Sequence, residues 1–125
     1  GGRVEPSDQD RADTALRETE EEIGVPRSAI RVLGALPDYE MQSGFRISPV
    51  VGWIRPPYRT QSDPFEVQDV FEAPLAHFLA PANYQRRRYV LEGLDRRYLA
   101  VPYEGRYIWG ATAGMLYTLY QLLRG

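Results

Sequence analysis

The sequence predicts a mixed α/β layer fold, because two well-marked helical segments flank several short apolar segments that are typical of strands. The helical segments, at about 9–23 and 111–123, repeat apolar residues at spacings of three and four. Between them, β-branched and aromatic residues form runs bounded by Pro or Gly. The chain has 125 residues and shows no internal repeat or linker, so we expect one domain over 1–125.

The first helix is predicted over roughly 9–23, with Ser7 or Asp8 as its N-cap. Small and apolar side chains form a narrow stripe along it: Ala12, Ala15, Leu16, Thr19 and Ile23. Gly24 is expected to end the helix in the left-handed conformation, and Pro26 then prevents its continuation.

Two strands are expected after this helix. Ile30–Leu36 is apolar and β-branched, and Phe45–Ile54 is a second strand that Pro49 interrupts, which favours an edge or a bulge. The polar residues 37–44 predict a loop between the two strands.

The second half of the sequence predicts shorter elements. Val67 to Phe71 indicates a short strand, and Pro74 suits the first position of a short helix over 75–79. Tyr84–Leu91 and Arg97–Tyr103 predict a hairpin around Glu92-Gly93-Leu94-Asp95.

Bulk composition excludes several function classes. The formal net charge is −2, so there is no global basic field to hold nucleic acid. No apolar run approaches the roughly 18–20 residues of a membrane span. Cysteine is absent, which excludes disulfides and thiolate metal sites and fits a reducing compartment. We therefore expect a cytoplasmic protein without a nucleic-acid or membrane partner.

The first predicted helix ends in a dense acidic turn. Its sequence is Arg17-Glu18-Thr19-Glu20-Glu21-Glu22-Ile23-Gly24-Val25. Glu21 and Glu22 lie about 60° and 40° around a helix axis from Glu18, so the three carboxylates can converge on one point. Such crowding destabilises a helix unless a cation offsets it, and carboxylate oxygens suit Mg²⁺ or Mn²⁺. Arg17 can pair with Glu21, whereas Glu20 projects elsewhere; the alternative is an ordinary solvated acidic face.

Together with Gly1-Gly2, this turn resembles the Nudix box, G-x5-E-x7-R-E-U-x-E-E-x-G-U, in which U is aliphatic. Three details depart from the box: Asp8 replaces a glutamate, eight residues instead of seven then precede Arg17, and Thr19 stands at an aliphatic position. The Gly-Gly opening with one extra residue resembles the coenzyme A pyrophosphatase branch of Nudix hydrolases. Later segments are similar to that branch too: Phe45–Gly52, Glu66–Leu75 and Ile108–Ala113.

The resemblance implies an α/β/α Nudix sandwich, with a mixed sheet between helices, that cleaves a nucleoside diphosphate-linked substrate. Coenzyme A is the substrate we expect first, with 3′,5′-ADP and 4′-phosphopantetheine as products. The resemblance implies Mg²⁺ or Mn²⁺ held by three carboxylates and one backbone carbonyl: Glu18, Glu21, Glu22 and Gly1. Arg17 orients the carboxylates, Glu21 is catalytic, and Glu66, with Glu40 behind it, is the candidate for a further catalytic acid. An exposed acid without a role is the alternative for Glu66 and Glu40.

Alternatives remain open for substrate and assembly. The resemblance implies that the box binds the diphosphate and not the flanking groups, so ADP-ribose, NADH and an oxidised nucleotide are alternative substrates. A nucleotide-binding Nudix module without catalysis is an alternative function. The branch normally has a strand and an Arg-rich segment before the two glycines, so we expect that the chain is N-terminally truncated. Missing strands would leave an open sheet edge, completed by a preceding segment, a second copy in a homodimer, or another chain.

Two further features have weaker functional interpretations. Arg86-Arg87-Arg88, flanked by Tyr84 and Tyr89, is typical of a solvated strand, with contact to an anionic nucleotide as the functional alternative. His77 is the only histidine and has no neighbouring nucleophile or second histidine, so we expect no catalytic role for it.

Overall fold

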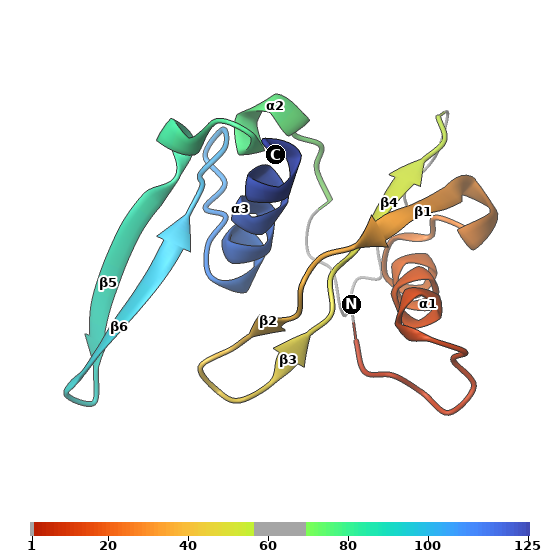
Figure 1. The fold of residues 1–125 in the computed structure, drawn as a ribbon, viewed down its shortest axis with the longest axis horizontal. Helices are drawn as coiled ribbons and strands as arrows, with labels where there is room; N and C mark the ends of the chain where they lie inside the picture. The colour runs from red at the N-terminus through yellow and green to blue at the C-terminus, as the bar shows by residue number, and fades with distance from the viewer. Residues whose placement is uncertain (1, 57–69) are drawn as a thin grey trace. The chain divides into compact units, whose positions relative to one another are not determined.

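The computed structural model describes residues 2–56 and 70–125. The chain divides into two compact units, one comprising 1–37 and 48–72 and the other 38–47 and 73–125. Each unit combines helix with antiparallel ladder, consistent with the α/β Nudix fold that the sequence predicts (Figure 1). The ladders within the described ranges are all two-stranded and antiparallel, so no mixed sheet occurs among these residues.

The first unit is a helix packed on a two-stranded ladder. Helix α1 (Arg11–Ile23) and the short helix η1 (Arg27–Ala29) precede β1 (Ile30–Ala35), which pairs with β4 (Val50–Ile54). The register of the ladder shifts at Leu33, which forms a bulge. A cavity of about 140 Å³ lies between the helix and the ladder, lined by Ala15, Leu16, Thr19, Ile30, Val32, Val50, Gly52 and Ile54. The predicted apolar stripe therefore faces the ladder.

The N-terminal end of α1 differs from the prediction. Neither Ser7 nor Asp8 is the N-cap; Asp10 is, and its Oδ1 accepts a hydrogen bond from the Asp13 N–H at 2.8 Å. Asp13 in turn accepts the N–H of Gln9 at 3.0 Å, so the two acids satisfy donors at both sides of the helix start. The prediction was wrong because several nearby polar residues can cap a helix, and the Asp8 side chain binds Arg17 instead.

The other end of α1 and the following strand confirm their predictions. Gly24 has φ 73° and donates its N–H to the Glu20 carbonyl at 2.9 Å, so a residue without a Cβ ends the helix. Val25 is fully buried directly after it. The chain then turns into β1, where the sequence predicts a strand.

The predicted loop over 37–44 contains a strand. Tyr39 and Glu40 form β2 (Tyr39–Glu40), which pairs with β3 (Arg46–Ile47). The strand predicted over 45–54 is therefore split into β3 and β4 around Ser48-Pro49. The split agrees with the predicted interruption, because proline cannot donate to a ladder. The sequence did not indicate β2, because it lies in a polar segment and two residues are too few to show an alternation of apolar and polar side chains.

The predicted hairpin is confirmed. It consists of β5 (Gln85–Leu91) and β6 (Leu94–Ala100), paired antiparallel with Arg88 opposite Arg97. Its turn is only two residues long, with φ 52° at Glu92 and 76° at Gly93. This left-handed backbone suits glycine and matches the twist of the strands. The second strand consequently begins earlier than predicted.

The hairpin shares the second unit with α2 (Leu75–Phe78), η2 (Pro81–Asn83) and the last helix α3 (Ala111–Leu123), which confirms the helix predicted over 111–123. Pro74 is the N-cap of α2 rather than its first residue. The core comprises Phe78, Val101 and Ala113, with Ala73, Tyr84, Leu99, Ile108 and Leu116 packed against it.

Three further predictions concern this region. The strand predicted from Val67 to Phe71 lies mostly outside the described residues, and residues 70 and 71 belong to no strand. His77 has its Nε2 2.8 Å from the Pro102 carbonyl and its ring against Phe78 and Tyr103, as expected of a structural residue. None of the helices described here has the length and apolar character needed to cross a membrane.

Candidate functional site

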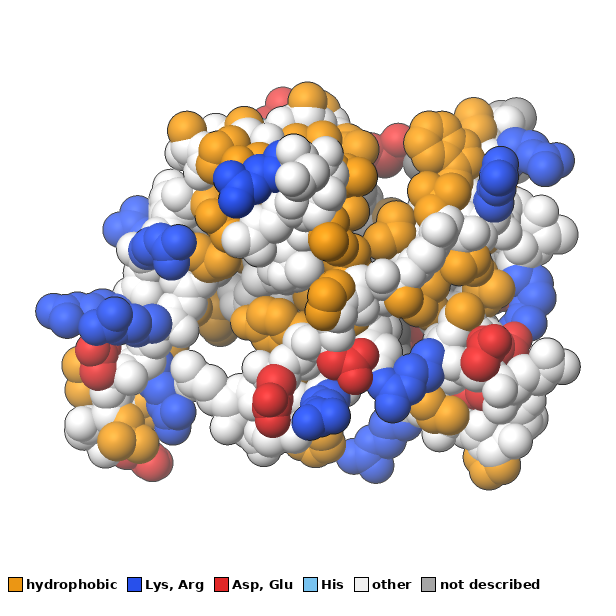
Figure 2. Space-filling view, viewed as in Figure 1, with side chains coloured by type: hydrophobic (Ala, Val, Ile, Leu, Met, Phe, Trp, Pro, Cys, Tyr) orange, Lys and Arg blue, Asp and Glu red, His pale blue; other side chains and the backbone are white. Residues whose placement is uncertain are grey.

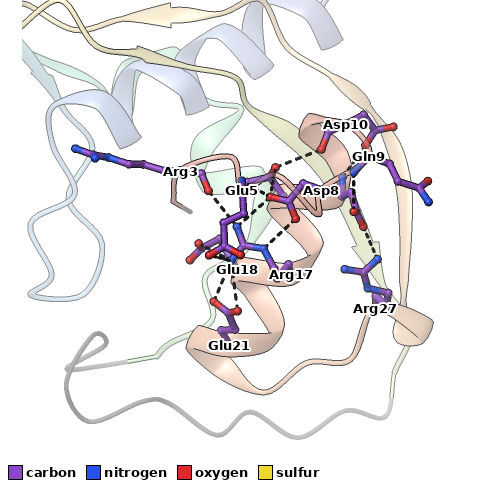
Figure 3. A network of polar contacts seen from close by, with 11 residues as sticks. Arg3, Glu5, Asp8, Gln9, Asp10, Arg17, Glu18, Glu21 and Arg27 are labelled. Carbon is purple, nitrogen blue, oxygen red and sulfur yellow. Dashed lines mark hydrogen bonds and ion pairs between the residues drawn. The ribbon is translucent and has the colours of Figure 1, made fainter.

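Arg17 is the centre of a polar network between α1 and the segment before it (Figure 3). Its Nε donates to Oδ1 of Asp8 at 3.0 Å, and its Nη2 donates to Oδ2 of Asp8 at 3.1 Å. Nη2 also donates to the backbone carbonyl of Arg3 at 3.0 Å. This paired arrangement fixes the plane of the guanidinium as well as its position.

Asp8 is almost fully enclosed, with 2% of its side chain exposed. Besides Arg17, it accepts hydrogen bonds from the Thr14 hydroxyl at 2.9 Å and the Glu5 N–H at 2.8 Å. The Arg17 guanidinium, followed by the Glu5 N–H, holds the pKa of the Asp8 carboxyl far below its usual range. Asp8 also raises the pKa of Arg17, with Glu18 and Glu21 acting in the same direction. The pair is therefore permanently ionised at neutral pH.

The third nitrogen of Arg17 faces the acidic turn. Nη1 lies 3.0 Å from Oε1 of Glu18, 3.2 Å from Oε2 of Glu21 and 3.5 Å from Oε1 of Glu5. Glu18 is 14% exposed, whereas Glu21 is 54% exposed. The helical spacing thus turns Glu18 and Glu21 toward one point, which the Arg17 guanidinium occupies in this arrangement.

Gly2 lies directly against the Glu18 carboxylate. A Cβ at position 2 would lie 2.3 Å from Oε1 of Glu18 and 2.4 Å from its Cδ. Such distances are far inside van der Waals contact, so any other residue here would displace the carboxylate or the loop. Gly2, the glycine that opens the box, therefore makes space for Glu18.

The remaining predicted site residues have different positions. Glu20 accepts the N–H of Arg27 at 3.3 Å, away from Arg17, as the sequence predicts. Glu22 is half-buried on the last turn of α1, and Glu40 is exposed on β2, in the second unit. Gly1 and Glu66 lie outside the described residues, so the roles assigned to them stay predictions.

The carboxylates around Arg17 fit the donor chemistry of a divalent cation. Glu18 and Glu21 offer hard oxygen ligands of the kind that Mg²⁺ and Mn²⁺ prefer. Four carboxylates contact one guanidinium, which leaves negative charge for a metal ion to offset: Glu5, Asp8, Glu18 and Glu21. Across residues 2–56 and 70–125, no three acidic or histidine side chains are already grouped as a metal site.

Sequence reasoning missed two members of this network, Glu5 and Asp8. Asp8 was expected as a helix cap and noted as a departure from the box, without a partner, and Glu5 was not singled out. A signal did exist for Asp8, because it stands where the Nudix box has a glutamate. In this protein the carboxylate at that position pairs with the arginine of the box.

Comparisons with known proteins agree with this geometry. The family model of the NUDIX domain matches residues 1–94, which include the whole network around Arg17. The Nudix hydrolase NudL of Escherichia coli is 41% identical over 118 residues, covering 93% of this chain and 60% of the relative, and NudL of Shigella boydii matches to the same extent. The chain thus spans about three fifths of the length of these relatives. The match over most of the chain shows that the protein belongs to the Nudix family.

Proposed function

We propose that this chain carries the catalytic helix of a metal-dependent pyrophosphohydrolase that cleaves nucleoside diphosphate-linked substrates. The observation that carries the proposal is the convergence of Glu18 and Glu21 on one point beside Arg17, within the matched family segment. A set of oxygen ligands on a rigid helix is what a diphosphate-bound Mg²⁺ or Mn²⁺ requires.

In this proposal, three glutamates of the acidic turn share the task of binding the metal, and Arg17 orients them. Glu18, Glu21 and Glu22 hold the metal, with the Gly1 carbonyl as a further ligand. When bound, the ion neutralises the diphosphate and lowers the pKa of an attacking water. Arg17 keeps the carboxylates of Glu18 and Glu21 oriented.

A carboxylate also acts as the general base that removes the proton from the attacking water. Glu21 is more than half exposed, so it is accessible to solvent and substrate. Glu66 is the proposed further acid. The water attacks phosphorus in line with the leaving phosphate oxygen.

Coenzyme A or one of its derivatives is the proposed substrate, giving 3′,5′-ADP and 4′-phosphopantetheine. The support is the resemblance of the Gly-Gly opening and of the later segments to the coenzyme A pyrophosphatase branch. ADP-ribose, NADH and oxidised nucleotides are the alternatives, because the acidic turn contacts only the diphosphate. We propose a small-molecule nucleotide partner, a cytoplasmic location, and one Nudix domain over 1–125 that associates with a second copy or with another chain.

The test is hydrolysis of a substrate panel by the full-length protein with Mg²⁺ or Mn²⁺. The double variant Glu21→Gln, Glu22→Gln keeps side-chain size and removes two charges, so we expect turnover to fall by 100-fold or more. Glu20→Gln is the matched control, because Glu20 lies on the same turn and its side chain contacts only the Arg27 backbone among the interactions described. Full turnover by the double variant would overturn the proposal, and nucleotide binding without turnover by the wild type would favour a non-catalytic module.

A further inference from the structure

Three arginines lie on one face of the β5–β6 hairpin. Side chains alternate along a strand, so Arg86 and Arg88 share a face of β5. Arg88 is paired directly with Arg97 of β6, which places a third guanidinium on that face. Like charges directly opposite one another destabilise a ladder. The fold therefore retains an unfavourable pair where a neutral residue would be more stable.

In the part of the chain that the structure describes, little negative charge compensates these arginines. Asp95 is 3.8 Å from Nη1 of Arg88 and 4.0 Å from Nε of Arg97, at the limit of an ion pair. Both arginines are more than 70% exposed, so each contact with Asp95 is weak. The Arg86 side chain forms no hydrogen bond or ion pair within 2–56 and 70–125. Figure 2 shows the basic side chains gathered over the hairpin.

A cavity of about 540 Å³ opens beside these arginines. Its lining residues all belong to the second unit: Tyr39, Arg86, Arg87, Arg88, Arg97, Tyr98 and Leu99. The volume is that of a small-molecule site. Tyr39 is a fixed wall, because a Cβ at Gly114 of α3 would lie only 2.5 Å from its ring.

We propose that this arginine groove binds the phosphate groups of a small nucleotide, with Arg88 and Arg97 as the principal ligands. Planar guanidinium groups bind phosphate oxygens in pairs, and a bound anion would relieve the repulsion between Arg88 and Arg97. Tyr39 offers an aromatic face for the base. A small nucleotide is favoured over RNA because the cavity is of limited size and the chain carries a net charge of −2.

The proposal goes beyond hydrolysis, since the groove contains no carboxylate of α1 and needs no metal ion. Calorimetric titration with ADP, and separately with tripolyphosphate, is therefore done in EDTA, with adenosine as the uncharged probe. We expect ADP and tripolyphosphate to bind, adenosine to bind at least tenfold more weakly than ADP, and added salt to weaken both anions.

The double variant Arg88→Gln, Arg97→Gln should weaken ADP binding at least tenfold, and the corresponding double lysine variant should bind with intermediate affinity. Arg96→Gln is the matched control, because Arg96 neighbours Arg97 on β6, lies on the opposite face and donates to Gln42 at 2.9 Å. The double variant should also keep or raise the melting temperature of the free protein, since it removes a repulsion.

Three results would overturn the proposal: unchanged ADP affinity in the double glutamine variant, equal weakening by Arg96→Gln, or binding of an oligoribonucleotide but not of ADP. The double variant Glu21→Gln, Glu22→Gln distinguishes binding in this groove from binding at the acidic turn, because it should bind ADP in EDTA as tightly as the wild type does. A wild type that binds ADP here but hydrolyses nothing would refute the proposed function and leave the groove intact.

Discussion

The Arg17 guanidinium donates two hydrogen bonds to the Asp8 carboxylate, at 3.0 and 3.1 Å, and nearly buries it. This pair joins the segment before α1 to the middle of the helix. The nitrogen that remains, Nη1, lies between Glu18 and Glu21. Arg17 is therefore a positioning residue whose orientation depends on Asp8.

Asp8→Asn should impair catalysis without touching a metal ligand. The amide keeps the shape of the carboxylate but removes its charge and one acceptor for the Arg17 fork, so Arg17 and its two glutamates lose their fixed orientation. We expect a 10–100-fold loss of activity or metal affinity, as is usual for groups that orient ligands. The loss is measured by determining kcat and KM of the variant and the wild type at a series of metal concentrations.

The control for this change is Asp10→Asn, because asparagine caps a helix as well as aspartate does. Asp10→Asn should keep full activity. Equal losses in the two variants would mean that the effect comes from the helix terminus rather than from the Arg17 pair.

The Asp8 carboxyl should make stability depend on acid pH. Its pKa is 3.8 in the unfolded chain and lies well below that in the folded protein, because Arg17 stabilises the ionised form. The stabilisation is therefore complete above the unfolded pKa and is lost as the pH falls below 3.8 toward the folded value. Urea unfolding at a series of pH values should show this loss in the wild type and a smaller one in Asp8→Asn. Parallel curves for the two proteins would contradict the assignment.

Gly2→Ala should disturb the acidic turn, because its Cβ would overlap the Glu18 carboxylate. We expect the metal concentration for half-maximal activity to rise about tenfold, since Glu18 must move away. Gly34→Ala is the matched control, because no atom lies within 4 Å of a Cβ added there. Metal titration of both variants measures the difference, and an unchanged Gly2→Ala protein would show that Glu18 is not confined as described.

Tyr84→Phe should destabilise the second unit. The Tyr84 hydroxyl donates to the Phe78 carbonyl at 2.8 Å, beside the core, and its loss should cost about 1 kcal/mol in the free energy of unfolding. Burial raises the pKa of Tyr84 to about 12, against 10.0 in the unfolded chain. Stability present below pH 10 should therefore fall as the pH rises toward 12, and Tyr84→Phe should reduce this dependence. Urea unfolding between pH 8 and 12 tests both effects.

Elements with strong local signals were predictable. Gly24 ends α1 because its left-handed conformation is a local property, and α3 follows from its apolar repeat. The two-residue strand β2 was not predictable, because its pairing with β3 lies in no local pattern. The N-cap was also mistaken, since local preference alone cannot choose among Ser7, Asp8 and Asp10.

The sequence by itself determined that Glu18 and Glu21 share a helix face, because helical spacing is fixed by backbone geometry. It also placed Gly2 in the box, without showing why glycine is needed there. Only the tertiary structure decided that Asp8 holds Arg17, that Gly2 leaves space for Glu18, and that Arg88 faces Arg97. These relationships join residues that are separated along the chain, and they depend on how the segments pack and pair.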